Sequence, residues 1–151
     1  LCRSAMAAMI ALAPAPMDRR QKRSLIRQLE ADAERIARHF GLRYRAIEAE
    51  RANVTSRYGV CYSDGTIRIR LNHATSGRAL KYSSLVATLC HELAHLRYFD
   101  HSKRFQRFNR DVLEWSRQQG IYQPGARRGA TPVPTPRVAE APRPQQLDLF
   151  D

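Results

Sequence analysis

The stretch that organises this sequence is residues 88–105, which read TLCHELAHLRYFDHSKRF. Residues 91–95 match the HExxH pattern, inside a run whose apolar residues recur at helical spacing. Positions four apart on a helix nearly eclipse, so we expect the imidazoles of His91 and His95 to project from one face, where one tetrahedral Zn²⁺ can bridge them. The chain's histidine and glutamate frequencies give only about 0.007 chance matches to this pattern. A pair of surface histidines without a metal is the alternative.

Glu92 lies beside the first histidine without being a ligand itself. From there its carboxylate can deprotonate a water whose pKa the metal lowers, so Glu92 is the predicted catalytic residue. A catalytic zinc keeps one coordination position open, which makes the third ligand decisive. We expect His101, just past the helix end, to be that ligand, giving one Zn²⁺ per chain. The alternatives for the third ligand are His39, His73 and Asp100, the last also as a residue that orients a histidine.

The sequence upstream and downstream predicts helix, sheet, helix and helix in that order. Apolar periodicity and Gly41 predict a helix that ends at residue 40, and residues 83–99 form the HExxH helix. Strands are expected at 42–50, 54–62 and 66–71, with Asp64-Gly65 as a two-residue hairpin turn. A last helix follows the N-cap Ser102. The fold class is therefore α+β, with a small antiparallel three-stranded sheet on the first helix and the HExxH helix.

The composition is basic: 26 Lys and Arg against 14 Asp and Glu give a net charge of +12 in 151 residues. This balance suits an anionic partner. We predict non-specific contacts with DNA phosphates and no membrane partner. Solvated structural faces are the alternative. Three cysteines cannot close a disulfide framework, which favours a cytoplasmic location. The candidate DNA contacts are Arg19, Arg20, Arg23 and Arg27 on the first helix and Arg68 and Arg70 on the third strand.

Proline positions divide the chain, because none of the 8 prolines lies between residues 17 and 123. We expect that window to be the folded domain. Residues 1–16 read as a disordered extension before Met17, with a cleaved signal peptide as the alternative, and their apolar run is too short to span a bilayer. Residues 124–145 are proline-rich and are expected to be a disordered linker. Residues 146–151 are apolar again and form a separate terminal peptide.

Residues 91–105 resemble the SprT-like and YgjP-like zinc metallopeptidases, whose pattern is HExxH, five residues, a His-Ser pair and an aromatic. Residues 56–72 resemble the family's Arg-Trp-Gly-Ser-Cys-Ser strand, turn and strand, so the resemblance covers about residues 54–108. It implies a zincin-like fold, zinc bound by three histidines, a catalytic Glu92, and a cleft bordered by the strand of Tyr58 and Gly59. Tyr58, Val60 and Gln106 stand where the family usually has Trp, Ser and Trp, and these departures bear on substrate preference.

The terminal peptide is similar to the bacterial sliding-clamp-binding motif, whose consensus is Gln-Leu-Ser/Asp-Leu-Phe. Its apolar side chains are costly to leave in water unless another surface receives them, and folding back onto the domain is the alternative. A flexible linker to the clamp raises the local concentration of the domain on DNA. The residues that match the motif are Gln146, Leu147, Asp148, Leu149 and Phe150.

These features together predict a cytoplasmic zinc metallopeptidase that the sliding clamp recruits to DNA, where it cleaves DNA-bound or DNA-crosslinked proteins. The last clause follows from a resemblance to Spartan-type repair proteases, which join an SprT-like domain to a clamp-binding tail. Two alternatives belong to other classes of protein. One is a non-proteolytic zinc hydrolase with a nucleotide substrate, and the other is a non-catalytic, clamp-associated DNA-binding adaptor.

Overall fold

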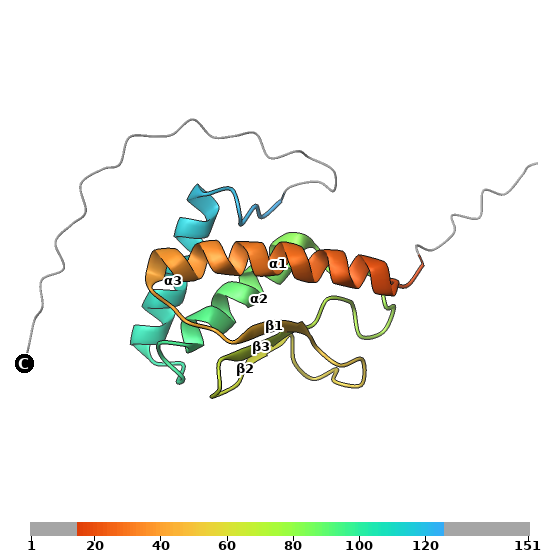
Figure 1. The fold of residues 1–151 in the computed structure, drawn as a ribbon, viewed down its shortest axis with the longest axis horizontal. Coiled ribbons are helices and arrows are strands. Elements are labelled where there is room, and N and C mark those ends of the chain that lie inside the picture. Colours follow the sequence, from red (N-terminus) through yellow and green to blue (C-terminus); the bar gives the residue numbers. More distant parts are fainter. Residues whose placement is uncertain (1–14, 126–151) are drawn as a thin grey trace, which may run out of the picture.

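The computed structural model describes residues 15–125. The order of its elements is helix, three strands, helix and helix, as predicted, and the α+β fold class is confirmed (Figure 1). The predicted N-terminal extension, linker and clamp-binding peptide lie almost entirely outside the described residues, so the domain boundaries stay predictions. The elements are α1 (Arg19–Phe40), β1 (Ala46–Ala49), β2 (Gly59–Cys61), β3 (Thr66–Ile69), α2 (Tyr82–His95) and α3 (Lys103–Gln118).

Helix α1 is capped at both ends. The Asp18 side chain accepts a hydrogen bond from the Gln21 backbone N–H at 2.8 Å, and the Gln21 side chain accepts one from the Asp18 N–H, which is a capping box. Gly41 ends the helix with φ of 67°, a left-handed conformation in which glycine is not strained. Its buried side chains are Leu29, Ala33, Ile36 and Ala37, which follow helical spacing.

The sheet is mixed rather than wholly antiparallel, which corrects the sequence prediction. The strand order is β1-β3-β2, with β2 antiparallel and β1 parallel to β3. Residues 50–58 connect β1 to β2, which are not neighbours in the sheet. The third strand, β3, lies between them. The parallel register sets Ile47 beside Ile67, and both are buried under the helices.

The hairpin between β2 and β3 has a three-residue loop, not the predicted two-residue turn. The Tyr62 N–H donates to the Thr66 carbonyl at 2.8 Å, which leaves residues 63–65 as the loop. The Gly65 N–H donates back to Tyr62, and Gly65 has φ of 88°. A turn followed by a left-handed glycine is the usual three-residue hairpin, in which the glycine supplies the extra residue of a bulge.

Helix α2 ends at His95, earlier than the apolar periodicity predicted. The N–H groups of Leu96 and Arg97 each donate to a carbonyl three residues back, so the last turn tightens. The carbonyl of Tyr98 then accepts a hydrogen bond from the ring of His95. The chain therefore turns away from α2 after His95 and comes back beside the end of this helix at His101.

The core lies between the inner face of the sheet and the helices, as the layers in Figure 1 indicate. Ile67 and Ile69 of the central strand are completely buried against α2, and each such side chain contributes about 1.5 to 3 kcal/mol of burial free energy. Helix α2 is packed by α1, α3 and two strands. No helix among residues 15–125 combines the length and apolar character that crossing a membrane requires.

Candidate metal centre

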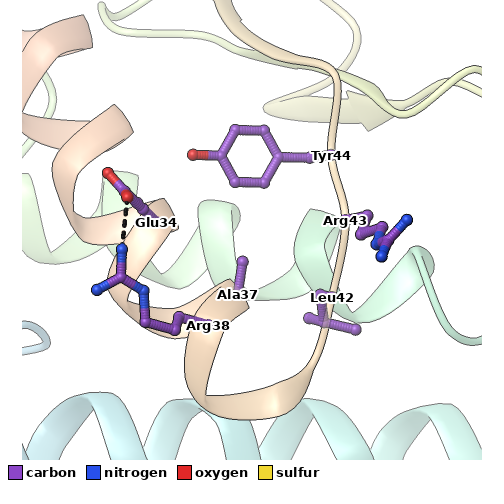
Figure 2. A pocket seen from close by; sticks show the side chains of 6 residues that line it. All are labelled: Glu34, Ala37, Arg38, Leu42, Arg43 and Tyr44. Atoms are coloured by element: carbon purple, nitrogen blue, oxygen red, sulfur yellow. Dashed lines mark hydrogen bonds and ion pairs between the residues drawn. The ribbon is translucent and has the colours of Figure 1, made fainter.

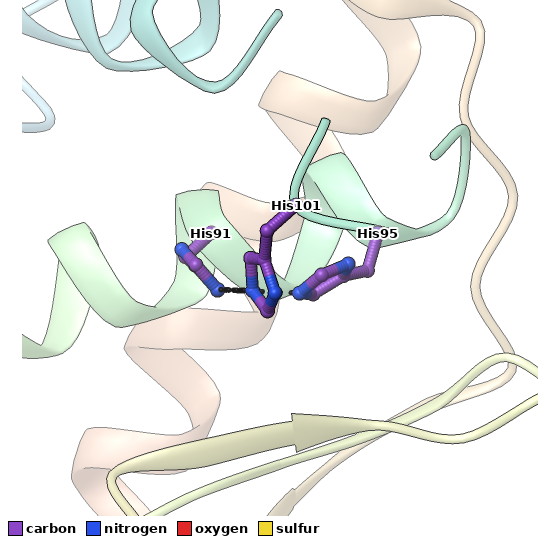
Figure 3. A group of neighbouring side chains, drawn as sticks. All are labelled: His91, His95 and His101. Carbon is purple, nitrogen blue, oxygen red and sulfur yellow. Dashed lines mark hydrogen bonds between the residues drawn. The ribbon is translucent and has the colours of Figure 1, made fainter. Parts of the chain in front are cut away.

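Three histidine rings converge at the end of α2 (Figure 3). His91 and His95 project from one face of the helix, as their spacing predicted, and His101 approaches from the loop that follows it. The Nε2 atom of His91 lies 3.2 Å from Nε2 of His95 and 3.2 Å from Nε2 of His101. The ligand atoms of the three residues all lie within 4.8 Å of one another.

This geometry fits a tetrahedral metal ion. Two nitrogens bound at 2.0–2.1 Å and at the tetrahedral angle lie about 3.3 Å apart, close to the two separations of 3.2 Å. Three imidazoles would fill three of the four positions of a bound ion and would leave one for water or substrate. Within residues 15–125, no other group of three or more His, Cys, Asp or Glu side chains is arranged to hold a metal.

The ring of His95 is oriented by the backbone. Its Nδ1 lies 3.0 Å from the carbonyl oxygen of Tyr98, so Nδ1–H donates and the lone pair of Nε2 faces the other rings. Burial, followed by the neighbouring histidines, lowers the pKa of His91 below its usual value. Burial also lowers the pKa of His95, against the effect of its backbone hydrogen bonds. Both rings are therefore neutral near pH 7, the form that binds metals.

Phe105 lies behind the three histidines. Its ring stacks on His95 with centroids 4.4 Å apart, and it meets His91 and His101 edge to face at 4.9 and 5.1 Å. Only 2% of Phe105 is exposed. The sequence motif includes this aromatic but does not assign it a role. Its position in the first turn of a helix capped by Ser102 is the sequence signal that places it beside His101.

The loop that carries His101 is fastened to α3. The Ser102 hydroxyl accepts a hydrogen bond from the Phe105 N–H at 3.4 Å, which confirms Ser102 as the N-cap. The Gln106 side chain donates to the His101 carbonyl at 3.2 Å. Helix α3 thus holds both the backbone and the ring of His101.

Glu92 is buried beside the histidines, with 6% of the residue exposed. Burial raises the pKa of its carboxyl to about 7, and the charge of Arg57 opposes that rise. The neighbouring strand comes very close: a Cβ added to Gly59 would lie 2.8 Å from Oε1 of Glu92 and 2.7 Å from Cγ2 of Thr88. Glycine at residue 59 is therefore required by the close approach of β2 to α2.

None of the competing third ligands belongs to the group of side chains that could hold a metal. His39 stacks on Trp115, with ring centroids 4.3 Å apart and planes at 16°. His73 is exposed in the connection before α2, and Asp100 is exposed in the loop before His101. The thiols of Cys61 and Cys90 are partly or fully buried, and burial raises the pKa of each to about 11, so both remain protonated at neutral pH.

The predicted DNA contacts fall into two groups with different environments. The four arginines of α1, Arg19, Arg20, Arg23 and Arg27, are all exposed. Arg68 instead pairs with Glu48 at 3.0 Å, and its side chain is 25% exposed. Arg70 is buried: its guanidinium donates to the Thr55 carbonyl at 2.7 Å and lies over the ring of Tyr58. The sheet arginines are thus already engaged within the protein.

An open hollow lies elsewhere, between the end of α1 and the chain that leaves it (Figure 2). It measures about 380 Å³ and contains the ion pair of Arg38 with Glu34. The ring of Tyr44 stands opposite that pair, and burial together with Glu34 raises the pKa of its hydroxyl. None of the metal-centre histidines lines this hollow, so we do not assign it to the reaction.

The fold is α+β, with two histidines and a glutamate on a helix packed against the sheet. The chain matches the family described as YgjP-like, metallopeptidase domain, over residues 11–119. The protein therefore belongs to the YgjP-like metallopeptidase family, in agreement with the resemblance found in its sequence.

Solved structures of Wss1 share the fold. A mutant of Wss1 from Saccharomyces cerevisiae aligns with a TM-score of 0.61 and 17% identity, over 73% of this chain and 91% of that one. Wss1 from the same organism aligns with a TM-score of 0.56 and 20% identity, over 64% of this chain and 79% of that one. A Wss1 mutant from S. pombe aligns with a TM-score of 0.55 and 18% identity, over 68% of this chain and 89% of that one. At these identities the likeness establishes the fold alone. No curated protein matched the chain.

Proposed function

We propose that this protein is a zinc-dependent metallopeptidase in which His91, His95 and His101 hold one Zn²⁺ and Glu92 is the general base. The observation that carries the proposal is the convergence of three imidazole Nε2 atoms, two pairs of them 3.2 Å apart, next to a buried carboxylate. A purely structural zinc site is usually closed by four protein ligands. Three imidazole ligands, with a glutamate beside them that is not a ligand, are the arrangement of a catalytic site.

Imidazole ligands and tetrahedral spacing favour zinc among the divalent metals. When bound, zinc polarises a peptide carbonyl and lowers the pKa of water toward 7. Three neutral nitrogens add no negative charge, so they preserve the electrophilic character of the ion.

Glu92 would accept the proton of the attacking water on a carboxylate oxygen and then pass it to the leaving amine. Its pKa of about 7 suits both steps, because a base poised near the working pH can take a proton and release it again. Arg57, whose charge opposes the rise in this pKa, helps to keep a fraction of the carboxyl ionised.

The substrate would lie along β2 as an extended chain. β2 is an edge strand of the described sheet, since its only partner there is β3. Backbone groups on its free edge can pair with an extended peptide, and Gly59 permits a close approach to Glu92. Tyr58, which is 60% exposed at the start of this strand, is placed to contact substrate side chains.

The test of this proposal replaces Glu92 with Gln, which keeps the size of the side chain and removes the base. We expect proteolysis to fall by at least about 100-fold while bound zinc, measured by atomic absorption, stays at one ion per chain. Glu34→Gln, an exposed glutamate outside the metal centre, is the matched control. Full turnover by Glu92→Gln would reject Glu92 as the base, and zinc retained without turnover in the wild type would favour the adaptor.

We further propose that the protein is cytoplasmic and that the sliding clamp recruits it to DNA, where it cleaves DNA-bound or DNA-crosslinked proteins. The clamp-binding motif at residues 146–150 and the net charge of +12 support this part. Replacing both Leu147 and Phe150 with Ala should abolish binding to the purified clamp, whereas replacing Pro142 and Pro144 with Ala should not. Persistent binding by the first variant would refute the motif.

The nucleotide-hydrolase alternative is tested with the same preparation. A zinc hydrolase of that class would release phosphate from nucleoside triphosphates in a Glu92-dependent manner. We expect no such release, and we expect cleavage of an unfolded protein instead. Phosphate release without peptide cleavage would replace the peptidase proposal by this alternative.

A further inference from the structure

Three arginines on the sheet and in nearby loops are paired with carboxylates: Arg45, Arg57 and Arg68. Arg57 pairs with Glu50 at 2.9 Å, and Arg45 pairs with Asp64 at 3.1 Å. The first two turns of α3 differ. Four exposed cations occur there without an ion pair or a side-chain hydrogen bond among the described residues: Lys103, Arg104, Arg107 and Arg110. We call these four residues the α3 ridge.

Three members of the α3 ridge share one side of the helix. At about 100° per residue, Lys103, Arg107 and Arg110 fall within an arc of about 60°, directly opposite the buried Phe105 and Val112. Arg104 lies about 60° outside this arc. Two carboxylates of α3 lie near this side: Asp111, which is exposed and four residues after Arg107, and Glu114, which already accepts two hydrogen bonds from Arg117, at 3.1 and 3.0 Å. Among the described residues neither carboxylate forms an ion pair with a member of the ridge, and the four cations outnumber the two carboxylates.

The position of these cations is unfavourable for the helix itself. Lys103 and Arg104 are the first residues of α3, and its first turn contains no acidic residue. The partial positive charge at a helix N-terminus favours carboxylates and disfavours cations there. Stability alone does not explain this arrangement. The same cations and the same helix end attract an anion.

The α3 ridge begins beside the metal centre. Its first residue, Lys103, is two residues after His101, and Gln106 on the same helix holds the His101 carbonyl. Phe99, in the same loop, is 60% exposed and makes no ring contact with the described residues. An exposed aromatic next to a row of cations is the pairing that single-stranded nucleic acids use, with bases stacked on rings and phosphates on cations.

We propose that the α3 ridge and Phe99 bind a single nucleic-acid strand alongside the metal centre. This inference rests on the nucleic-acid part of the proposed function and assigns that role to a surface absent from the sequence prediction. Residues 103–110 extend for about 10 Å along the helix axis, the length of about three phosphates at a rise of 3.4 Å. A strand held there places a protein attached to it within reach of the metal centre.

The test measures binding of a labelled oligothymidine of about 15 nucleotides by fluorescence anisotropy across a range of salt concentrations. The ridge variant K103Q/R107Q/R110Q should lower the slope of log affinity against log salt by about 2, since each lost phosphate contact removes about 0.7 on a single strand. The loop variant R43Q/R51Q/R78Q removes the same charge from exposed positions outside α3 and should leave the slope unchanged. Zinc content and melting temperature check the folding of each variant.

Phe99 is tested separately, because stacking does not depend on salt. Phe99→Leu should weaken oligothymidine binding by about tenfold without changing the slope, and Phe99→Tyr should restore it. Equal weakening of a duplex of the same length would show that Phe99 does not stack on bases, and would overturn its part in the proposal.

Three results would overturn the ridge. Equal losses in the ridge and loop variants would show bulk charge only. A full loss in the α1 variant R20Q/R23Q/R27Q, with none in the ridge variant, would move the contact to α1 and leave the proposed function intact. Competition by polyglutamate as strong as by unlabelled oligothymidine would identify an acidic polypeptide as the partner. If the wild type binds no oligothymidine while proteolysis still requires Glu92, the nucleic-acid part of the proposed function fails too, and the peptidase stands.

Discussion

The ring of Phe105 stacks on the ring of His95 at a centroid distance of 4.4 Å, and the same phenylalanine contacts the other two histidines of the metal centre by its edge or face. A single buried side chain thus restricts the rotation of every predicted ligand. Histidine side chains that are already held in place lose less conformational entropy when they bind a metal, because most of that entropy is lost when the protein folds.

Replacing Phe105 with Leu should weaken zinc binding by about 10- to 100-fold, the usual effect of removing a group that orients metal ligands. A chelator-competition titration measures this. Phe108→Leu is the matched control, because Phe108 is also buried on α3 but packs on Phe40 and Tyr98, away from the histidines. Equal zinc affinities in the two variants would mean that Phe105 contributes to stability alone.

The sequence was sufficient for the features that depend on local chemistry. HExxH at helical spacing predicted two rings on one face, and Gly41 and Ser102 marked helix boundaries that the structure confirms. These signals reside in a few consecutive residues whose backbone preferences agree with the fold. The placement of the His101 ring followed from the same short stretch.

Other features depend on contacts between distant segments and could not be read locally. The parallel pairing of β1 with β3 depends on where the chain crosses the sheet, and periodicity in a strand carries no information about its partner. The alternation of Arg68 and Arg70 indicated a basic face, but Glu48 and the loop before β2 neutralise or cover it. Which cations of α3 are unpaired depends on the ion pairs of the folded protein, and the sequence does not give these.

The close contact between Gly59 and α2 leads to a second prediction. Gly59→Ala inserts a methyl group that must displace either Thr88 or Glu92, because its carbon would lie only 2.7 and 2.8 Å from their nearest atoms. We expect a loss of about 1 to 3 kcal/mol in the free energy of unfolding and a lower kcat, since the Glu92 carboxylate shifts from its position. Denaturant unfolding and steady-state kinetics measure the two effects.

The double variant Gly59→Ala, Thr88→Ser provides the control, because serine lacks the Cγ2 atom that the new methyl group meets first. It should recover part of the stability. If Gly59→Ala has the stability and kcat of the wild type, then β2 and α2 are not in close contact in solution.

A third prediction concerns the dependence of stability on pH. The Glu50 side chain is inaccessible to solvent and pairs with Arg57. Burial raises the pKa of this carboxyl, but the hydrogen bonds from Arg51 and Arg57 and the nearby arginine charges outweigh it, so the pKa lies below the ordinary value. A lowered pKa means that the stabilisation is present above the ordinary glutamate pKa and is lost as the pH falls through the lower folded value.

Glu50→Gln should therefore melt several degrees below the wild type at pH 7, and the two melting temperatures should converge as the pH falls below about 4. Thermal unfolding followed by circular dichroism measures this. Glu30→Gln, an exposed position on α1, should differ little from the wild type at either pH. A gap that widened in acid would mean that the folded pKa of Glu50 is raised.

The last prediction separates a catalytic metal from one that holds the fold together. The core of the domain is built from side chains of the sheet and all three helices, and the metal centre lies at its edge, where His101 is exposed. Removing the metal should therefore leave a folded protein with unchanged far-ultraviolet circular dichroism, unlike a zinc finger, which unfolds without zinc.

Metal binding still stabilises the native state by mass action, by about 4 kcal/mol when zinc is present at 1,000 times its dissociation constant. For a domain of this size, that corresponds to a rise of about 10 °C or more in melting temperature, which scanning calorimetry of the chelated and zinc-loaded protein measures. Glu92→Gln should show the same rise because it keeps all three ligands, whereas His101→Ala should show little of it. Unfolding of the wild type on chelation would assign the metal a structural role and favour the adaptor over the peptidase.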